Sequence, residues 1–367
     1  MKLFVKFFSL DEVNNVLEVH SWTGMSWHDA HLTWTPSDYG NVTFLHVSSK
    51  DIWLPDFALY DSGDLSQNTA FKRTTCLVYP QGTVLCVPIT KWPVHCRPNL
   101  RQWPFDSHEC TMKIGSWTHV GEMIDITLKD GGVDLDDFQG SREWELKNVT
   151  AIKNVATYDC CPNATYPSVT YKFIIKRHAS AYAATVTVPS LILTAMTLSS
   201  FWLDPEPPHR LAMCSISILC HCLYLQYLGV KLPSNGDMTP VIVLFFRNSI
   251  IICVAALVLS VIQLRLSSPL VSPDYGSDSA PLWLTRLLGM ALDQEIGRII
   301  FLGRVNSMNP LAKCDVAALI ENGTDVNEAH GKIHNEWIIL VAVIDHLAFF
   351  MVLLTYIVLL IDLIPVD

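Results

Sequence analysis

Four apolar stretches of about 20 residues or more constrain the fold most strongly, because a helix of that length is long enough to cross a bilayer. The stretches cover residues 179–203, 211–230, 240–264 and 337–364. Half of the 367 residues are hydrophobic and only 16% are charged, which is too few for an ordinary soluble protein. The composition therefore predicts a multi-pass membrane protein.

The second apolar stretch differs from the other three because it is the least apolar and carries His221 and Gln226. Polar side chains within a membrane-spanning helix favour a helix that faces protein or water. A set of residues at alternating spacings of four and three shares one face of this helix: Ala212, Ile216, Leu219, Leu223 and Gln226. This stripe predicts either a pore lining or a lipid-facing or buried surface.

The part of the chain before residue 178 has a different pattern, made of short alternating segments rich in β-branched and aromatic residues. Examples are residues 16–22, 75–87 and 170–175, and turn residues separate such segments. This spacing predicts an all-β sandwich. The chain thus divides into a β-rich part followed by a helical membrane part.

Six of the 11 cysteines precede residue 178, an even number that is compatible with three disulfides. Residues 75–87 look like a hairpin, with Gln81-Gly82 at its middle. Cys76 and Cys86 would then lie roughly opposite each other. They either form a cross-strand disulfide or serve as two small apolar residues.

Cys96 and Cys110 enclose 13 residues in the segment CRPNLRQWPFDSHEC. A disulfide that closes such a loop needs an oxidising compartment and is worth about 3 kcal/mol. The tip residues Trp103, Pro104 and Phe105 are too apolar to be left in water. We expect the tip to dock against another apolar surface.

A 13-residue cystine loop with an aromatic-Pro-Phe-Asp motif resembles the signature of the Cys-loop, or pentameric ligand-gated, ion channels. The order of segments resembles that family too, so the resemblance covers nearly the whole chain. It implies an extracellular ligand-binding β-sandwich (1–177), three transmembrane helices (178–264), a cytoplasmic loop (265–335), and a fourth helix with a short extracellular tail (336–367). The start of the loop, which is rich in Ser and Pro, should be disordered.

The dipeptide Cys160-Cys161 lies between two tyrosines in YDCCPNATY, which resembles the ligand-capping loop of nicotinic acetylcholine receptor alpha-type subunits. The resemblance implies a disulfide between the two adjacent cysteines. Neighbouring Cα atoms are only about 3.8 Å apart, which is below the usual range for disulfide partners. Two unpaired thiols are the alternative.

Quaternary ammonium cannot donate hydrogen bonds, so a protein that selects it surrounds it with aromatic rings. The resemblance assigns this role to Tyr60, Trp117, Tyr158 and Tyr166, together with the Cys160-Cys161 loop. Trp22 would close the box from the opposite face of a neighbouring subunit, beside Leu85 and Val87. Three further tryptophans are predicted to be core residues: Trp27, Trp34 and Trp53.

The resemblance also names residues that couple the pocket to the membrane. Glu12 and Arg177 match an ion pair at the domain junction, and Lys113 matches a lysine that contacts Tyr158. The tip of the cystine loop would push on the connection that contains Pro240. In alpha subunits an aspartate completes a Lys-Tyr-Asp relay, and this chain has Ser168 at that position. The relay that couples closure of the pocket to opening of the channel is therefore incomplete.

The resemblance makes the stripe on the second helix a pore lining, with Leu219 and Leu223 as an apolar gate. The cytoplasmic mouth departs from cation-conducting subunits, because His209 and Arg210 stand where those subunits carry Glu and Lys. We favour cations, since Glu206 lies one turn away. An anion channel and a non-conducting ligand-binding or assembly-modifying subunit are the alternatives.

Three sequons in the β-rich part, at Asn41, Asn148 and Asn163, predict glycosylation on the secretory side. A fourth, at Asn322, falls in the predicted cytoplasmic loop and should stay bare. The start of the chain lacks a signal peptide, so we expect a truncated sequence. The pattern indicates no enzyme, metal, cofactor or nucleic acid. It implies an agonist such as acetylcholine, partner subunits in a pentamer and a postsynaptic plasma membrane.

Overall fold

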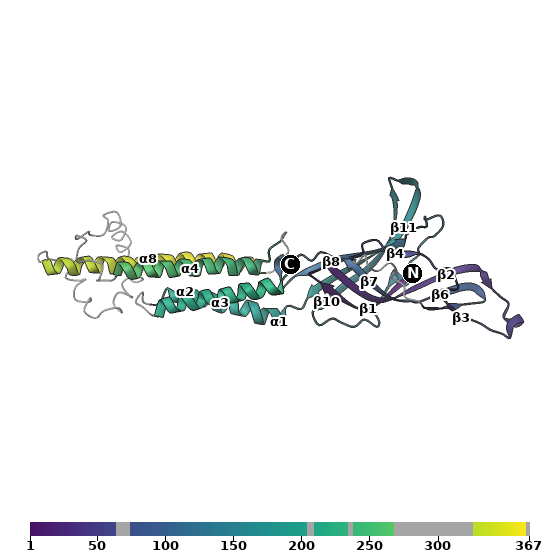
Figure 1. The fold of residues 1–367 in the computed structure, drawn as a ribbon, viewed down its shortest axis with the longest axis horizontal. Coiled ribbons are helices and arrows are strands. Elements are labelled where there is room, and N and C mark those ends of the chain that lie inside the picture. Colours follow the sequence, from purple (N-terminus) through teal and green to yellow (C-terminus); the bar gives the residue numbers. More distant parts are fainter. Residues whose placement is uncertain (64–73, 204–208, 234–237, 268–325, 365–367) are drawn as a thin grey trace. The chain divides into compact units, whose positions relative to one another are not determined.

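The computed structural model describes residues 1–63, 74–203, 209–233, 238–267 and 326–364 (Figure 1). The chain forms two compact units. The first comprises Met1–Tyr182 and Leu232–Pro240, and the second comprises Ala183–Lys231 and Val241–Asp367. The described residues of the connection before Pro240, 232–233 and 238–239, therefore belong to the β-rich unit. Most of the predicted cytoplasmic loop, with Asn322, lies outside the described residues.

The first unit is a β-sandwich of a seven-stranded and a four-stranded sheet. The larger sheet has the order β3-β5-β6-β2-β1-β9, with β7 paired to β2: β1 (Lys2–Asp11), β2 (Val16–Thr33), β3 (Leu45–Ser48), β5 (Thr75–Val78), β6 (Gln81–Cys86), β7 (Ile89–His95), β9 (Val133–Asp134). The smaller sheet has the order β10-β11-β8-β4: β4 (Phe57–Leu59), β8 (Ser107–Ser116), β10 (Trp144–Tyr158), β11 (Cys161–Arg177). Short 3-10 helices lie in the connections: η1 (Pro36–Tyr39), η2 (Leu100–Gln102), η3 (Asp130–Gly132).

The core of the sandwich lies between the inner faces of the two sheets. Strand β1 supplies Leu3 and Val5, and strand β11 supplies Tyr171, Phe173 and Ile175, all of which are buried. Successive residues of a strand point to opposite faces, so every second residue enters the core. The predicted all-β sandwich is thus confirmed.

The predicted disulfide of the cystine loop is present, and of the two alternatives for Cys76 and Cys86 the structure shows the disulfide. Cys76–Cys86 joins the neighbouring strands β5 and β6, with the turn between them at the predicted position. Cys96–Cys110 links the end of β7 to β8 and closes the 13-residue loop. Gly82 in the hairpin has φ of +84°, and a Cβ there would lie 2.4 Å from the carbonyl oxygen of Asp29, so only glycine fits.

The second unit consists of helices α2 (Val188–Ser200), α3 (His209–Lys231), α4 (Val241–Ser267) and α8 (Val326–Asp362). The chain enters α2 through α1 (Ser180–Tyr182), which belongs to the first unit, and a π-helical turn, η4 (Ala183–Thr187). Four segments are long and apolar enough to span a membrane: Ser180–Ser200, His209–Lys231, Val241–Leu264 and Val343–Asp362. They confirm the four predicted spans.

Candidate functional site

Tyr60 and Trp117 come together beside the pairing of β4 and β8 in the smaller sheet. Tyr60 directly follows β4 and Trp117 directly follows β8, and these strands are antiparallel, so the two rings meet across a pairing of only three residues. The two ring centroids are 6.1 Å apart in an edge-to-face arrangement. The Tyr60 hydroxyl donates a hydrogen bond of 2.6 Å to the carbonyl oxygen of Ser116, so the bond orients the tyrosine beside Trp117.

Tyr158 and Tyr166 lie near the tip of the β10–β11 hairpin, which projects from the sandwich (Figure 1). Their rings also meet edge to face, with centroids 5.3 Å apart. Burial and the nearby Tyr158, Asp56 and Tyr166 raise the pKa of Tyr60 above its ordinary value, so the hairpin pair and the Tyr60–Trp117 pair are electrostatic neighbours. Each of the four aromatic residues predicted for one face thus lies in a ring pair, and the two pairs are linked by the effect of Tyr158 and Tyr166 on Tyr60. Trp117 remains 70% exposed, which leaves its ring available to a ligand.

Asp56 holds the loop that carries Trp117 and was missed in the sequence. Its carboxylate accepts hydrogen bonds from Ser116 Oγ (2.5 Å), Thr118 Oγ1 (2.6 Å) and Thr118 N (2.7 Å). Burial alone would raise the pKa of Asp56, but these donors and His119 outweigh burial and hold the pKa well below its ordinary value. An acidic residue directly before a predicted ligand segment, in WLPDFALY, was the available signal.

Lys113 and Ser168 lie beside the cluster on the paired strands β8 and β11. Lys113 Nζ stands 5.4 Å from the centroid of the Tyr60 ring, so its contact with Tyr158 stays a prediction. Ser168 is fully buried, and its hydroxyl has no hydrogen-bond partner among the described residues. The position that was predicted to lack the relay aspartate is therefore enclosed by protein.

The structure differs from the sequence prediction at Cys160 and Cys161, which are separate thiols. A hydrogen bond with Cys161, followed by burial, raises the pKa of the Cys160 thiol. The short distance between adjacent Cα atoms opposes a disulfide between these two residues.

Trp22 lies on β2 of the larger sheet, so within one chain it is on a different sheet from the other four aromatic residues. It is 42% exposed, and Lys6 Nζ lies 3.7 Å from its ring centroid. Val87 is also exposed, as expected for a residue on an outer face. Trp27 and Trp34 pack against a buried cluster, but the prediction for Trp53 is wrong because it is 48% exposed.

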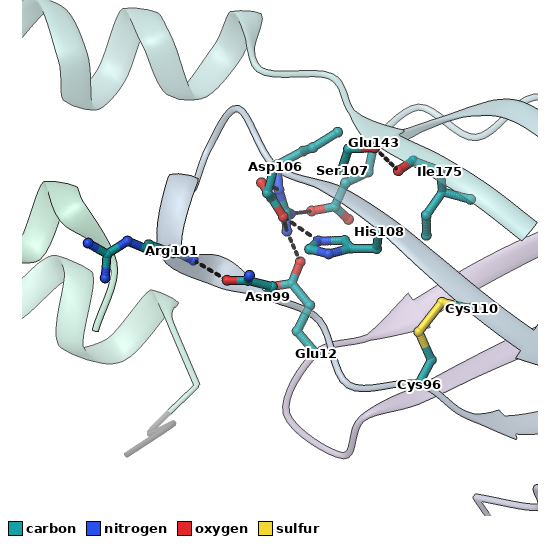
Figure 2. A network of polar contacts seen from close by, with 11 residues as sticks. Glu12, Cys96, Asn99, Arg101, Asp106, Ser107, His108, Cys110, Glu143 and Ile175 are labelled. Atoms are coloured by element: carbon teal, nitrogen blue, oxygen red, sulfur yellow. Dashed lines mark hydrogen bonds and ion pairs between the residues drawn. A yellow bond between two sulfur atoms is a disulfide. The ribbon is translucent and has the colours of Figure 1, made fainter. Parts of the chain in front are cut away.

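Arg177 forms the predicted ion pair with Glu12 and has two further acidic partners, Asp106 and Glu143. Figure 2 labels these three acids around the network. Arg177 Nε donates to Asp106 Oδ1 at 2.8 Å, and Nη1 donates to Glu143 at 3.2 Å. His108 Nε2 lies 2.5 Å from the same Asp106. Burial alone would raise the pKa of Asp106, but its bonds with His108 and Arg177 hold that pKa below its ordinary value. The two cystine-loop residues Asp106 and His108 were missed as members of this network.

The tip of the cystine loop docks against an apolar partner, as expected. Trp103 is 3% exposed, and its ring centroid lies 4.9 Å from that of Tyr182 in α1. Pro104 is buried and Phe105 is half-buried. The proposed push of this tip on Pro240 stays a prediction.

The predicted stripe on α3 forms one exposed face: Ala212, Ile216, Leu219, Leu223 and Gln226. His209 is exposed too and continues the same spacing by three residues. The opposite face is buried and carries Cys214, Ser217, His221 and Leu228. His221 thus faces protein, as its polarity indicated. The exposed face is available to line a pore, and that role stays a prediction.

The prediction that Arg210 lines the pore is wrong. Its side chain is fully buried, and Nη1 and Nη2 donate to the two carboxylate oxygens of Asp345 in α8 at 2.7 and 2.8 Å. Gln263 of α4 donates to the same carboxylate at 2.8 Å. The physical reason is helical geometry, because residue 210 falls on the buried face of α3 rather than on the stripe.

A second polar contact chain between the helices was not predicted. His221 Nε2 lies 2.6 Å from Ser249 Oγ of α4, which in turn lies 2.7 Å from the hydroxyl of Tyr356 in α8. All three residues are buried. The polar residues of these apolar helices therefore face one another inside the second unit.

The three predicted glycosylation sites are exposed: Asn41, Asn148 and Asn163. Exposure is necessary for modification, so these positions remain candidates. Asn148 lies on β10, and Asn163 lies near the β10–β11 hairpin tip. Modification at Asn163 would place a glycan five residues from Tyr158 along the chain.

Comparisons with known proteins agree with this geometry. Residues 1–179 match the model of the neurotransmitter-gated ion-channel ligand binding domain. The chain is 31% identical over 257 residues to the acetylcholine receptor subunit alpha-type acr-16 of Caenorhabditis elegans, which covers 70% of this chain and 51% of that protein. It is 32% identical over 256 residues to the human neuronal acetylcholine receptor subunit alpha-2, covering 70% and 48% respectively.

A longer match is to the acetylcholine receptor subunit alpha-1-A of Xenopus laevis, with 26% identity over 332 residues, 90% of this chain and 70% of that protein. The chain spans about half the length of the first two relatives. It belongs to the family of neurotransmitter-gated ion channels, which are not enzymes. Within that family its similarity is to alpha-type nicotinic subunits, and the four apolar helices make it a multi-pass membrane protein.

Proposed function

We propose that this chain is a subunit of a pentameric, acetylcholine-gated ion channel of the postsynaptic plasma membrane. The observation that carries the proposal is the aromatic cluster of Tyr60, Trp117, Tyr158 and Tyr166. The rings form two edge-to-face pairs, with centroids 6.1 Å apart in one and 5.3 Å apart in the other, and Tyr158 and Tyr166 lie near enough to Tyr60 to act on its pKa. Each ring that faces a quaternary ammonium contributes roughly 0.5 to 2 kcal/mol.

The test of this proposal is Trp117→Ala in the full chain, expressed with an alpha-type relative as partner. We expect agonist binding to weaken by about 1 to 3 kcal/mol, because a cation contact and apolar area are lost. Tyr39→Ala is the matched control, since Tyr39 is also an exposed aromatic residue but lies in η1, away from the strands that carry the cluster. Unchanged agonist affinity in a folded, surface-delivered Trp117→Ala receptor would reject the aromatic box.

We propose that the conducted ions are cations and that the α3 stripe with Leu219 lines the path. The Arg210–Asp345 pair supports cations, because it neutralises the positive charge that would favour anions. His209 then remains at the exposed start of α3 in place of an acid. His209→Glu should increase cation selectivity, and reversal potentials under ion substitution measure it. Anion-selective reversal potentials in the wild type would reject this part of the proposal.

A non-conducting, ligand-binding or assembly-modifying subunit is the second candidate, and Ser168 favours it. The buried hydroxyl of Ser168 cannot supply the charge of the relay aspartate, so ligand binding would be weakly coupled to opening. Current recording with and without partner subunits separates the two candidates. Agonist binding without current in either condition would favour the second candidate.

A further inference from the structure

Strand β1 contains an extra residue at Lys6, which determines where this side chain lies. The pairing of β1 with β2 runs from Val5 opposite Ser21 to Phe7 opposite His20, so the register shifts at Lys6. A β-bulge redirects the side chain of its extra residue. Here Lys6 Nζ lies 3.7 Å from the centroid of the Trp22 ring, within cation–π distance.

An ion pair holds the tip of the Lys6 side chain, and a hydrogen bond holds the backbone of the same residue. Its ammonium lies 2.5 Å from Asp137, and its backbone carbonyl accepts a hydrogen bond of 2.7 Å from Gln139 N. The Lys6 side chain is only 18% exposed, although Trp22 is 42% exposed. The Lys6 ammonium is therefore held over the Trp22 ring by its ion pair and is not freely solvated.

A second lysine of β1, Lys2, also lies over an aromatic ring and pairs with an aspartate. Lys2 Nζ lies 5.3 Å from the centroid of the Phe4 ring and 2.8 Å from Asp134. Phe4 is directly opposite Trp22 in the register of β1 and β2. Strand β1 thus has two lysines that each lie over an aromatic ring and pair with an aspartate. Lys2 provides a control for Lys6.

A ring face that already holds an ammonium group is a poor site for a second cation. The two positive charges would repel each other at a separation of a few ångströms. The ligand would also have to displace Lys6 from Asp137 before it could contact the ring. Trp117 contrasts with Trp22, because its side chain is 70% exposed.

We propose that Lys6 occupies the Trp22 face and thereby specialises this chain for the principal, Trp117-bearing side of a pocket. A quaternary ammonium ligand would then bind tightly only where another kind of subunit, with an uncovered tryptophan, supplies the opposite side. This inference rests on the proposed function. Lys6 is then a residue that determines which pockets bind the ligand. The receptor that binds tightly is heteromeric.

The experiment measures acetylcholine binding to receptors made from the full chain alone, in which every pocket uses the Trp22 of this chain. Lys6→Gln removes the charge and should lower the dissociation constant about 10-fold. Lys6→Arg keeps a cation over the ring and should bind as weakly as the wild type. Lys2→Gln removes the equivalent charge over Phe4 and should also leave the dissociation constant unchanged.

Mixed receptors with an alpha-type relative separate failure of this inference from failure of the proposed function. Binding in mixed receptors that depends on Trp117, together with no gain from Lys6→Gln in receptors of this chain alone, overturns the role of Lys6 and leaves the proposed function standing. Loss of all Trp117-dependent binding in both assemblies overturns both. A gain in Lys6→Gln that Lys2→Gln reproduces also overturns the inference, because the effect would then be one of net charge.

Discussion

Arg177 and Arg210 are both buried arginines held by carboxylates, but their two sites balance charge differently. Arg177, at the end of β11, contacts three acids: Glu12, Asp106 and Glu143. Arg210, at the start of α3, pairs with the single carboxylate of Asp345. The side chains of both arginines are at most 1% exposed, so burial of the cation does not explain the difference.

The exposure of the acidic partners explains why the two arginines have different numbers of acids. The carboxylate of Glu143 is half-exposed, so water can hydrate part of the surplus negative charge around Arg177. The carboxylate of Asp345 is 2% exposed and lies among apolar helices, where an unpaired charge is expensive. A one-to-one pair, completed by Gln263, is the arrangement that such surroundings tolerate. In this chain the site with an acid that reaches water holds three acids, and the site whose acid is shielded from water holds one.

The largest expected effect is that of Arg177→Gln. This change leaves the buried carboxylate of Asp106 without its guanidinium, and breaking such a pair costs about 3 to 5 kcal/mol. We expect loss of folded, surface-delivered protein, measured by surface labelling. Arg101→Gln, at an exposed arginine of the same cystine loop, is the control and should be delivered normally. Normal delivery of Arg177→Gln would show that the network is dispensable.

The next effect tests whether Arg210 depends on one partner alone. Arg210→Gln should lower stability by roughly 3 kcal/mol, because it leaves Asp345 as an unpaired buried charge. Adding Asp345→Asn should restore much of that stability, as judged by thermal unfolding in detergent. The matching pair at the other site, Arg177→Gln with Glu12→Gln, should show no such rescue because Asp106 remains. Additive losses at Arg210 and Asp345 would contradict one-to-one pairing.

The smallest effect is the pH dependence of the Arg177 site. The pKa of Asp106 is held below its ordinary value in the folded state, so its stabilising contribution is present above about pH 4 and is lost as pH falls through the lower folded pKa. The difference in melting temperature between the wild type and Asp106→Asn should therefore stay constant from pH 7 to pH 5 and shrink below pH 4. If the difference in melting temperature already shrinks at pH 6, the pH dependence belongs to a group other than Asp106.

Local patterns in the sequence predicted the elements of the fold. The alternation of strands, the hairpin of Cys76 and Cys86 and the apolar spans all depend on residues close together in the chain. The stripe on α3 also follows from local spacing, and the same spacing could have excluded Arg210 from it. Trp53 was misplaced because an aromatic residue by itself does not reveal which face of a loop it occupies.

The positions of the aromatic residues at the candidate site were predictable because each lies in a recognisable motif, but the groups that hold them were not. Asp56 reaches Ser116 and Thr118 across sixty residues of chain or more. Lys6 covers Trp22 because of a bulge that periodicity does not reveal. At this site the sequence therefore predicted which aromatic residues take part, but not which residues contact them.

The sequence by itself determined the membrane class, the two parts of the chain, the cystine loop and the family, because covalent spacing and short-range periodicity encode them. Only the tertiary structure decided which charges are neutralised. Arg177 and Glu12 are 165 residues apart in the chain, and Arg210 and Asp345 are 135 apart. Electrostatic pairing depends on distance in space and on access to water, and both quantities exist only once the sheets and helices have packed.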